Sequence, residues 1–357
     1  MAAIWRGFQL VFLVLCLAAV LPAEQSAAEV LIEHGHWKRA RALVEARIRA
    51  APDDPLANFL LSQIRNAFGD RDTPLELAEK ALRIDPGTAK YHRQVAEVLG
   101  VMAQHSGALR QLFLARRFRK EIDAALAIDP RDAQALRDLL EFYLLAPGIV
   151  GGDPKKAVAM ADRIAAVNAP QGFLARARIA EFQKQDAEAA ANLRKAVEAD
   201  PPSYRARITA AEYFLAPEHR DWKAAEAYSR DALRLDASRV DAHVILAGLA
   251  AERGELDALE SILAASVKAV PDDPAPYYRA ADRLLAAHRD PSRAERYLRT
   301  YLAQPAEGNQ PTHAYAHWKL GNALEMQNRK SEAVNSWKES IRLDPESPAT
   351  RDLKRVR

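Results

Sequence analysis

A glycine-rich stretch is the most unusual segment of this 357-residue chain, and loops of such composition can hold phosphate groups. It covers residues 146–154, with the sequence Ala-Pro-Gly-Ile-Val-Gly-Gly-Asp-Pro. A phosphate-binding loop needs a Gly-Lys-Ser/Thr ending and a preceding strand, whereas this segment lacks that ending and follows a helical pattern. Turn-forming glycines and a helix cap explain the composition. A second interpretation stays open, in which a specialised ligand or partner loop is formed by Gly148, Gly151, Gly152 and Asp153.

Two His-Arg-Asp triplets, at residues 219–221 and 288–290, have the composition of a protein-kinase catalytic loop. That loop carries an asparagine five residues after the aspartate, where it binds a second metal ion. In this chain the corresponding positions hold Glu226 and Glu295. Each triplet also falls at an expected turn between two helices, so neither predicts phosphoryl transfer.

Metal and nucleophile chemistry have equally little support. His34 with His36, and His313 with His317, each bring two imidazoles together, but no neighbouring carboxylate or thiolate completes a plausible metal site. No Gly-x-Ser-x-Gly motif is present, and the only cysteine, Cys16, lies in an N-terminal apolar run. We therefore predict no catalytic residue, no metal and no cofactor, and we expect that the protein is not an enzyme.

The first 23 residues differ from the rest of the chain. Arg6 is followed by an unbroken apolar run over residues 10–20, and Ala23 provides a small residue at the end of the segment. This pattern is typical of a secretory signal peptide, here residues 1–23, and predicts a periplasmic or secreted protein. An uncleaved N-terminal anchor is the alternative, although the run is shorter than the roughly 20 residues of a spanning helix.

Composition favours an all-helical chain with no affinity for nucleic acid. The 51 lysines and arginines nearly balance 48 aspartates and glutamates, and the two signs alternate along the sequence instead of forming a basic arm. Glycine contributes only 14 residues, and runs of β-branched residues with period-two alternation are absent. The elements that position any site must therefore be helices.

An internal repeat organises these helices. A dipeptide such as Asp-Pro ends one helical segment after another, and Pro52 and Pro86 are 34 residues apart, the period of a helix-turn-helix unit. The last copy predicts one helix over residues 314–327 and a second over 330–343. The repeat-ending dipeptides are Ala51-Pro52, Asp85-Pro86, Asp129-Pro130, Asn168-Ala169, Asp200-Pro201, Asp236-Ala237, Val270-Pro271, Gln304-Pro305 and Asp344-Pro345.

The last copy carries a family resemblance. Its sequence Trp-Lys-Leu-Gly-Asn-Ala-Leu over residues 318–324, followed by Ala333, Trp337, Ser340 and Pro345, resembles the tetratricopeptide repeat. The resemblance implies a right-handed superhelical solenoid of antiparallel helix pairs, with eight to nine repeats over residues 24–347. Residues 348–357 are then too few for a full capping helix, and we expect a basic, frayed C-terminal tail.

The same resemblance implies a scaffold or adaptor that binds a protein or peptide partner in a concave groove. Aromatic residues and arginines often dominate interface energies, and the first helices of the repeats project such side chains inward. We expect the region 313–322 to be the principal contact. Alternatively, Trp318 and Tyr278 pack between repeats, and the arginines pair with Glu97, Glu141 and Glu212 across the groove. The predicted partner-binding residues are Arg93, Arg137, Arg178, Arg205, Tyr278, Tyr315, Trp318 and Asn322.

An alternative function rests on the glycine-rich loop. Residues 133–165 resemble part of the periplasmic tetratricopeptide component of tripartite (TRAP) transporters. That resemblance implies a solute-handling component of a periplasmic transport assembly.

Overall fold

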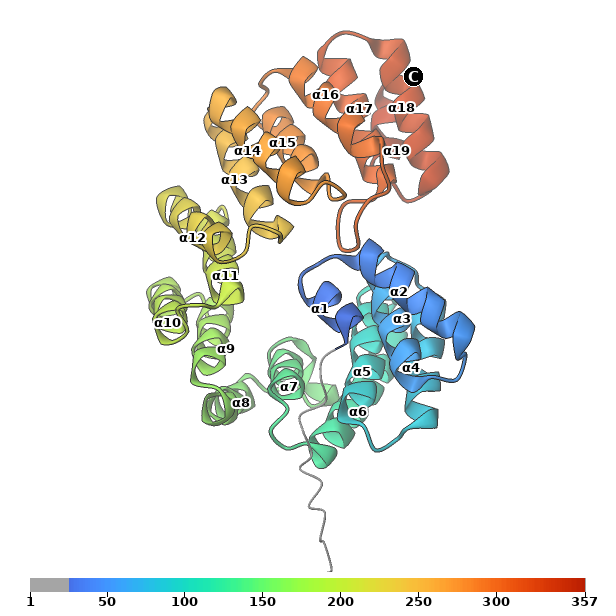
Figure 1. Cartoon of the computed structure of the whole chain (residues 1–357), viewed down its shortest axis with the longest axis vertical. Coiled ribbons are helices and arrows are strands. Elements are labelled where there is room, and N and C mark those ends of the chain that lie inside the picture. The colour runs from blue at the N-terminus through green and yellow to red at the C-terminus, as the bar shows by residue number, and fades with distance from the viewer. Residues whose placement is uncertain (1–25, 357) are drawn as a thin grey trace, which may run out of the picture.

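The structure, a computed structural model, describes residues 26–356, so the predicted signal segment at residues 1–23 lies outside the described residues. Over residues 26–356 the chain forms 19 α-helices and a short 3-10 helix, η1, with no strand. The prediction of an all-helical solenoid is confirmed (Figure 1). The helices are α1 (Ala27–Glu33), α2 (Trp37–Ala50), α3 (Pro55–Ala67), α4 (Thr73–Ile84), α5 (Ala89–Gln104), α6 (Ala108–Ile128), α7 (Ala133–Leu145), η1 (Gly148–Val150), α8 (Pro154–Val167), α9 (Ala169–Phe182), α10 (Asp186–Ala199), α11 (Tyr204–Leu215), α12 (Trp222–Leu235), α13 (Val240–Arg253), α14 (Leu256–Ala269), α15 (Ala275–Ala286), α16 (Pro291–Leu302), α17 (His313–Met326), α18 (Lys330–Leu343) and α19 (Ala349–Arg355).

The last helix pair shows how the repeat motif builds each unit. A Cβ atom at Gly321 on α17 would lie only 2.3 Å from the indole nitrogen of Trp337 on α18, so the glycine makes room for the tryptophan. Trp337 is 1% exposed, and its indole N–H donates a hydrogen bond to Asn322 Oδ1 at 3.0 Å. Ala333 is fully buried at the same helix contact. The small residues of the motif therefore allow two helices to approach around one large aromatic side chain.

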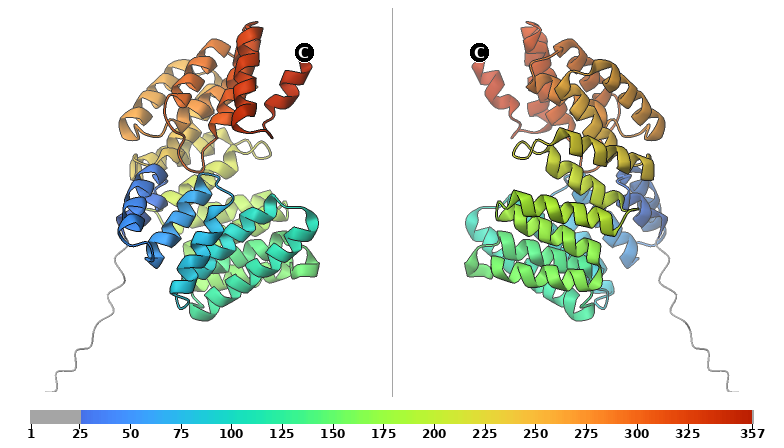
Figure 2. Two further views of the ribbon diagram at one scale, coloured as in Figure 1. Left: turned by 90° about the vertical axis from the view of Figure 1, so that its right-hand side faces the viewer. Right: turned by 90° about the vertical axis from the view of Figure 1, so that its left-hand side faces the viewer.

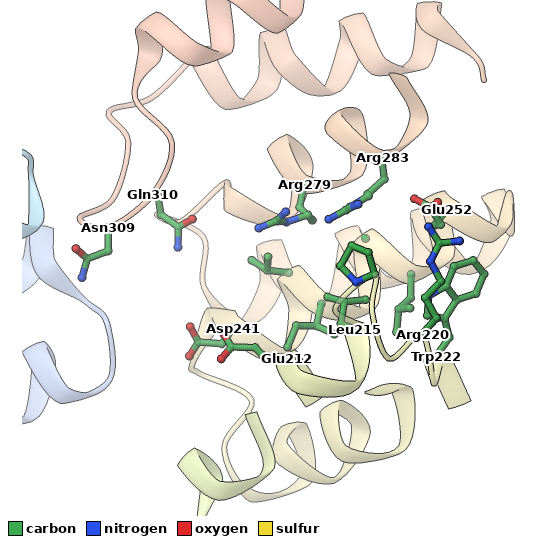
Figure 3. Close-up of a pocket in the computed structure, with 15 residues that line it drawn as sticks. Glu212, Leu215, Arg220, Trp222, Asp241, Glu252, Arg279, Arg283, Asn309 and Gln310 are labelled. Atoms are coloured by element: carbon green, nitrogen blue, oxygen red, sulfur yellow. The ribbon is translucent and has the colours of Figure 1, made fainter. Parts of the chain in front are cut away.

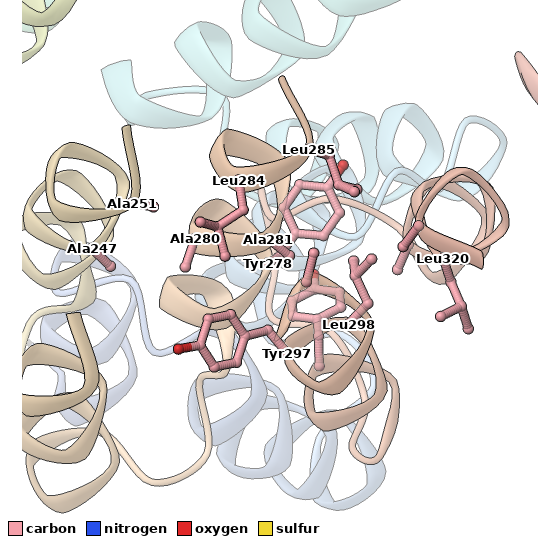
Figure 4. Close-up of a cluster of buried hydrophobic side chains, with 14 of the residues drawn as sticks. Ala247, Ala251, Tyr278, Ala280, Ala281, Leu284, Leu285, Tyr297, Leu298 and Leu320 are labelled. Carbon is pink, nitrogen blue, oxygen red and sulfur yellow. The ribbon is translucent and has the colours of Figure 1, made fainter. Parts of the chain in front are cut away.

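The core extends along the solenoid as a row of apolar clusters. In the C-terminal cluster, Tyr278 of α15, Tyr297 and Leu298 of α16, and Leu320 of α17 are all buried (Figure 4). One cluster therefore joins two consecutive helix pairs. A single pair is too small to bury its own apolar face, and each unit is stabilised mainly by its neighbours.

The third unit is longer than the others, as its sequence interval predicts. The additional length lies in α6, which has 21 residues. Its first turns extend past the core, so that Leu109 is 78% exposed and Phe113 69% exposed.

The C-terminal residues correct one prediction. Residues 349–355 do not form a frayed tail but the short helix α19, in which Ala349 is fully buried and Leu353 is 8% exposed. Arg355 forms an ion pair with Glu325 of α17 at 2.7 Å. The segment is basic in composition, but Ala349 and Leu353, four positions apart, form an apolar face that packs the helix against α17 and α18.

The solenoid curves until its two ends meet, which the sequence did not indicate. Figure 1 shows α1 and α2 beside the long loop between α16 and α17, and both side views in Figure 2 keep these segments together. The backbone N–H of Lys38 donates to Glu307 Oε1 at 2.7 Å, and the N–H of Asn309 donates to the carbonyl oxygen of Ala67 at 2.7 Å. Arg39 also forms an ion pair with Asp272 at 2.5 Å. We call these contacts the ring closure.

The ring closure is tightly packed as well as hydrogen-bonded. A Cβ atom at Gly308 would lie 2.7 Å from the Trp37 ring, so only glycine fits against the first turn of α2. Glu307 is 3% exposed, and its burial raises the pKa of the carboxyl to about 7. Within residues 26–356, no helix is long and apolar enough to cross a membrane.

Candidate partner-binding surface

The first helices of several repeats line a hollow on the inside of the ring, which we call the inner basin. Its volume is about 500 Å³, and its walls come from α1, α3, α5, α7, α11 and the start of α13. Helices far apart in sequence therefore face one hollow, because the solenoid curves around it. The lining residues are Glu29, Ile32, Glu33, Phe59, Gln63, Lys90, Arg93, Gln134, Arg205 and Arg239.

Arginines dominate one side of the inner basin. Arg205 is exposed toward the hollow, but the pKa of its guanidinium is lowered to about 10, because the walls of the hollow reduce its contact with water and because Arg137 and Arg239 add positive charge nearby. Neither Arg137 nor Arg205 forms a close ion pair within the described residues. The negative charges of Asp138, Glu141 and Glu97 still act on Arg137, and those of Asp138 and Glu33 act on Arg205. Arg239 instead lies over the Tyr204 ring at 4.0 Å. An anionic group that enters the hollow would reduce the electrostatic repulsion of Arg205 by Arg137 and Arg239.

A smaller pocket continues the basin toward α9. Its volume is about 160 Å³, and Arg137, Arg178 and Arg205 all line it. Arg205 belongs to both hollows, so four of the predicted arginines, including Arg93, gather on one continuous surface. Arg178 is already paired, since its Nε and a terminal nitrogen contact the two carboxylate oxygens of Glu141 at 2.8 and 3.1 Å.

The predicted aromatic contacts lie elsewhere and make internal contacts. Tyr278 is 7% exposed and packs against Tyr301 with ring centroids 5.2 Å apart. Trp318 donates its indole N–H to Asp352 of α19 at 2.7 Å, so the C-terminal helix partly covers it. Asn322 accepts the hydrogen bond from Trp337. Of the four C-terminal residues, Tyr315, at 41% exposed, keeps the most accessible ring.

The glycine-rich loop forms a tight connection between α7 and α8. Gly151 has φ of +102°, which favours glycine, and a Cβ at Gly152 would lie 1.7 Å from the carbonyl oxygen of Ala146. Asp153 caps α8 by accepting a hydrogen bond from the Lys155 N–H at 3.1 Å. These contacts bear out the structural interpretation of the loop composition. Whether Gly148 and its neighbours also hold a ligand remains a prediction.

Sequence reasoning missed the basin residues contributed by α1, α3 and α13, and Lys90 of α5. Phe59 and Lys90 lie near one another, with the ammonium group 5.3 Å from the ring centroid, and Lys90 also pairs with Glu29 at 2.9 Å. Their positions on first helices could have suggested them. Their placement opposite Arg205 depends on the curvature of the whole ring, which no single repeat specifies. In the described residues, no group of three or more histidine, cysteine or acidic side chains could hold a metal ion.

Stacked antiparallel helix pairs whose first helices line an inner hollow define an α-helical solenoid. The tetratricopeptide repeat family matches residues 26–89 and 278–348. These segments hold α1 to α4 and most of α15 to α18, so the match covers helices at both ends of the solenoid.

Three solved structures show what the chain resembles. A thermophilic tetratricopeptide-repeat protein from Thermus thermophilus is 20% identical, with a TM-score of 0.47, over 53% of this chain and 96% of that protein. Yeast Tom70 is 14% identical, with a TM-score of 0.47, over 91% of this chain and 85% of its own. A tetratricopeptide repeat protein from Parabacteroides merdae is 16% identical, with a TM-score of 0.44, over 72% and 97% respectively. No curated protein sequence matches the chain.

Proposed function

We propose that this protein is a non-catalytic scaffold that binds an acidic segment of a partner protein in the inner basin. The observation that carries the proposal is the convergence of Arg93, Arg137 and Arg205 on two connected hollows, where Arg137 and Arg205 have no close ion-pair partner among the described residues. Unpaired guanidinium groups in a concave, partly enclosed surface favour carboxylates, which they can bind through two hydrogen bonds.

Partner capture tests the proposal directly. We expect the full chain to retain its protein partner from a native extract, and a variant with Arg137→Gln and Arg205→Gln to lose at least about 90% of it, because each lost charge-assisted contact costs about 1.5–3 kcal/mol. Rising salt should weaken retention by the unaltered chain, since the contacts are ionic.

A matched control is Arg234→Gln on α12, where the side chain is 72% exposed, pairs with Asp231 and lines none of these hollows. This variant should retain the partner fully. Trp318→Ala and Tyr315→Ala test the other predicted contact region. If capture depends on Trp318 or Tyr315 and ignores the two arginines, the basin is not the binding surface.

We further propose that the protein acts in the periplasm or outside the cell after removal of residues 1–23. The charged start, apolar run and small residue at position 23 support this location. Intact-mass measurement on the chain isolated from its natural host should then show a form that begins at Glu24. A chain that keeps residues 1–23 and stays with the membrane fraction would instead support the uncleaved anchor.

A further inference from the structure

A third pocket lies between α11, α13 and α15, and the loop of the ring closure forms part of its wall (Figure 3). Its volume is about 330 Å³, small enough for one amino acid or a peptide end. We call it the charged pocket. Its lining residues are Glu212, Leu215, Pro217, Arg220, Trp222, Asp241, Val244, Ile245, Gly248, Leu249, Glu252, Arg279, Arg283, Asn309 and Gln310.

The charged residues of this pocket are unusual because none of them has an ion-pair partner in the described part of the chain. Three arginines and three acidic residues line it, and no ion pair joins any of them to a residue in the range 26–356. One carboxylate oxygen of Glu252 is buried and has no hydrogen-bond partner within the same range. By contrast, the next residue, Arg253, pairs with Glu226 at 2.6 Å. The six residues are Arg220, Arg279, Arg283, Glu212, Asp241 and Glu252.

Two of the arginines and two of the acidic residues lie on opposite sides of the pocket, while Arg220 and Glu252 lie together at one end. Figure 3 shows Arg279 and Arg283 projecting from α15, with Glu212 and Asp241 across from them. Each of Arg279, Arg283 and Asp241 is half-buried, so leaving them unpaired costs solvation without a compensating contact. Glu212 is more exposed than these three, but the surrounding protein atoms and the negative charge of Asp241 raise the pKa of its carboxyl, and the positive charge of Arg279 offsets this rise only in part.

An apolar floor connects the two charged sides. Leu215 of α11 and Ile245 and Leu249 of α13 all face the pocket, and Leu249 is 2% exposed. A Cβ atom at Gly248 would lie 3.0 Å from Cγ of Arg279, so this glycine lets the arginine stem lie close against α13. The pocket therefore offers guanidinium groups, an apolar surface and carboxylates in that order.

We propose that the charged pocket binds a linear amphoteric group, with its carboxylate at Arg279 and Arg283, its ammonium at Glu212 and Asp241, and methylene carbons over the apolar floor. A free ω-amino acid and a peptide that ends in a lysine carboxylate share this chemistry. The assignment does not depend on a partner in the inner basin, because the two hollows have no lining residue in common.

Calorimetric titration of the full chain with three matched compounds tests the assignment. We expect 6-aminohexanoate to bind with a dissociation constant below about 10 mM. Hexanoate and hexylamine should bind at least about tenfold more weakly, because each leaves one charged side of the pocket without a partner. Equal binding of all three compounds, or no binding of 6-aminohexanoate and of the peptide below, would overturn the assignment.

Variants locate the site and distinguish the two sources of the ligand. Arg283→Gln and Asp241→Asn should each weaken binding at least about tenfold, whereas Arg234→Gln, far from the pocket lining, should leave it unchanged. Circular dichroism checks that each variant stays folded.

A peptide ending in lysine should bind as the free acid and lose binding as the C-terminal amide. If the peptide binds and 6-aminohexanoate does not, the ligand is a chain terminus. If Arg283→Gln binds both compounds with unaltered affinity, the proposal is wrong for the free amino acid and for the peptide.

Discussion

Replacing Trp337 by alanine is expected to destabilise the last two helix pairs by about 3–5 kcal/mol, the usual cost of removing a fully buried tryptophan side chain. The side chain is 1% exposed, fills the space left by Gly321 and donates a hydrogen bond to Asn322. The substitution would leave a cavity at the centre of the α17–α18 contact and would leave the amide oxygen of Asn322 without its donor.

Hydrogen exchange measured residue by residue is the suitable readout, because a helical-repeat protein can open locally at one end while the rest stays folded. We expect faster exchange in α17, α18 and α19, with little change in α7 to α9. The control is Leu343→Ala on the same helix, where the side chain is 43% exposed, and its effect should stay within about 0.5 kcal/mol. Similar exchange in the two variants would show that the tryptophan does not anchor the terminal repeat.

A leucine at Gly308 is expected to open the ring. The Cβ atom alone would lie 2.7–2.9 Å from three atoms of Trp37, so the larger side chain can be accommodated only if the loop leaves α2. Overpacking of this kind costs about 1–3 kcal/mol, which shifts the balance between closed and open forms by roughly fivefold to 150-fold. Once the loop leaves, the hydrogen bond from the Lys38 N–H to Glu307 is lost as well.

Spin labels at Arg71 and Glu346 provide the measurement, since both residues line one hollow between the two ends of the chain. Distances between the labels should lengthen in Gly308→Leu, and small-angle scattering should report a larger radius of gyration. Gly107→Leu is the matched control, because a Cβ at that glycine meets nothing within 4 Å. An unchanged distance distribution in Gly308→Leu would show that the ring does not depend on this contact.

The sequence predicted the repeat unit well because the determinants of a helix pair lie close together. Gly321 and Trp337 form one contact within a single unit, and the predicted helix at residues 330–343 matches α18. The loop at residues 146–154 was likewise explained by its own residues, with Asp153 capping α8. Local chemistry of this kind needs no knowledge of distant parts of the chain.

The candidate site was predicted only in part. Helix periodicity placed Arg93, Arg137, Arg178 and Arg205 on the inner surface, and the structure brings all four to two connected hollows. Other residues of the inner basin, such as Glu33 of α1 and Lys90 of α5, come from other repeats, and their position depends on small rotations accumulated over many units. Trp318 was predicted to contact a partner but makes an internal contact instead. Its hydrogen-bond acceptor, Asp352, lies on the short helix α19 beyond the last full repeat.

The contact between Lys38 and Glu307 joins positions 269 residues apart, which has a consequence for how the molecule assembles. An ordinary repeat protein gains each interface as soon as the next unit emerges, so its stability accumulates steadily along the chain. Here α2 pairs with a loop residue made 269 residues later, and closing so long a segment carries an entropic cost before it gives any stabilising contact. Once that step is complete, the first helix pair can fray only if it releases the loop between α16 and α17.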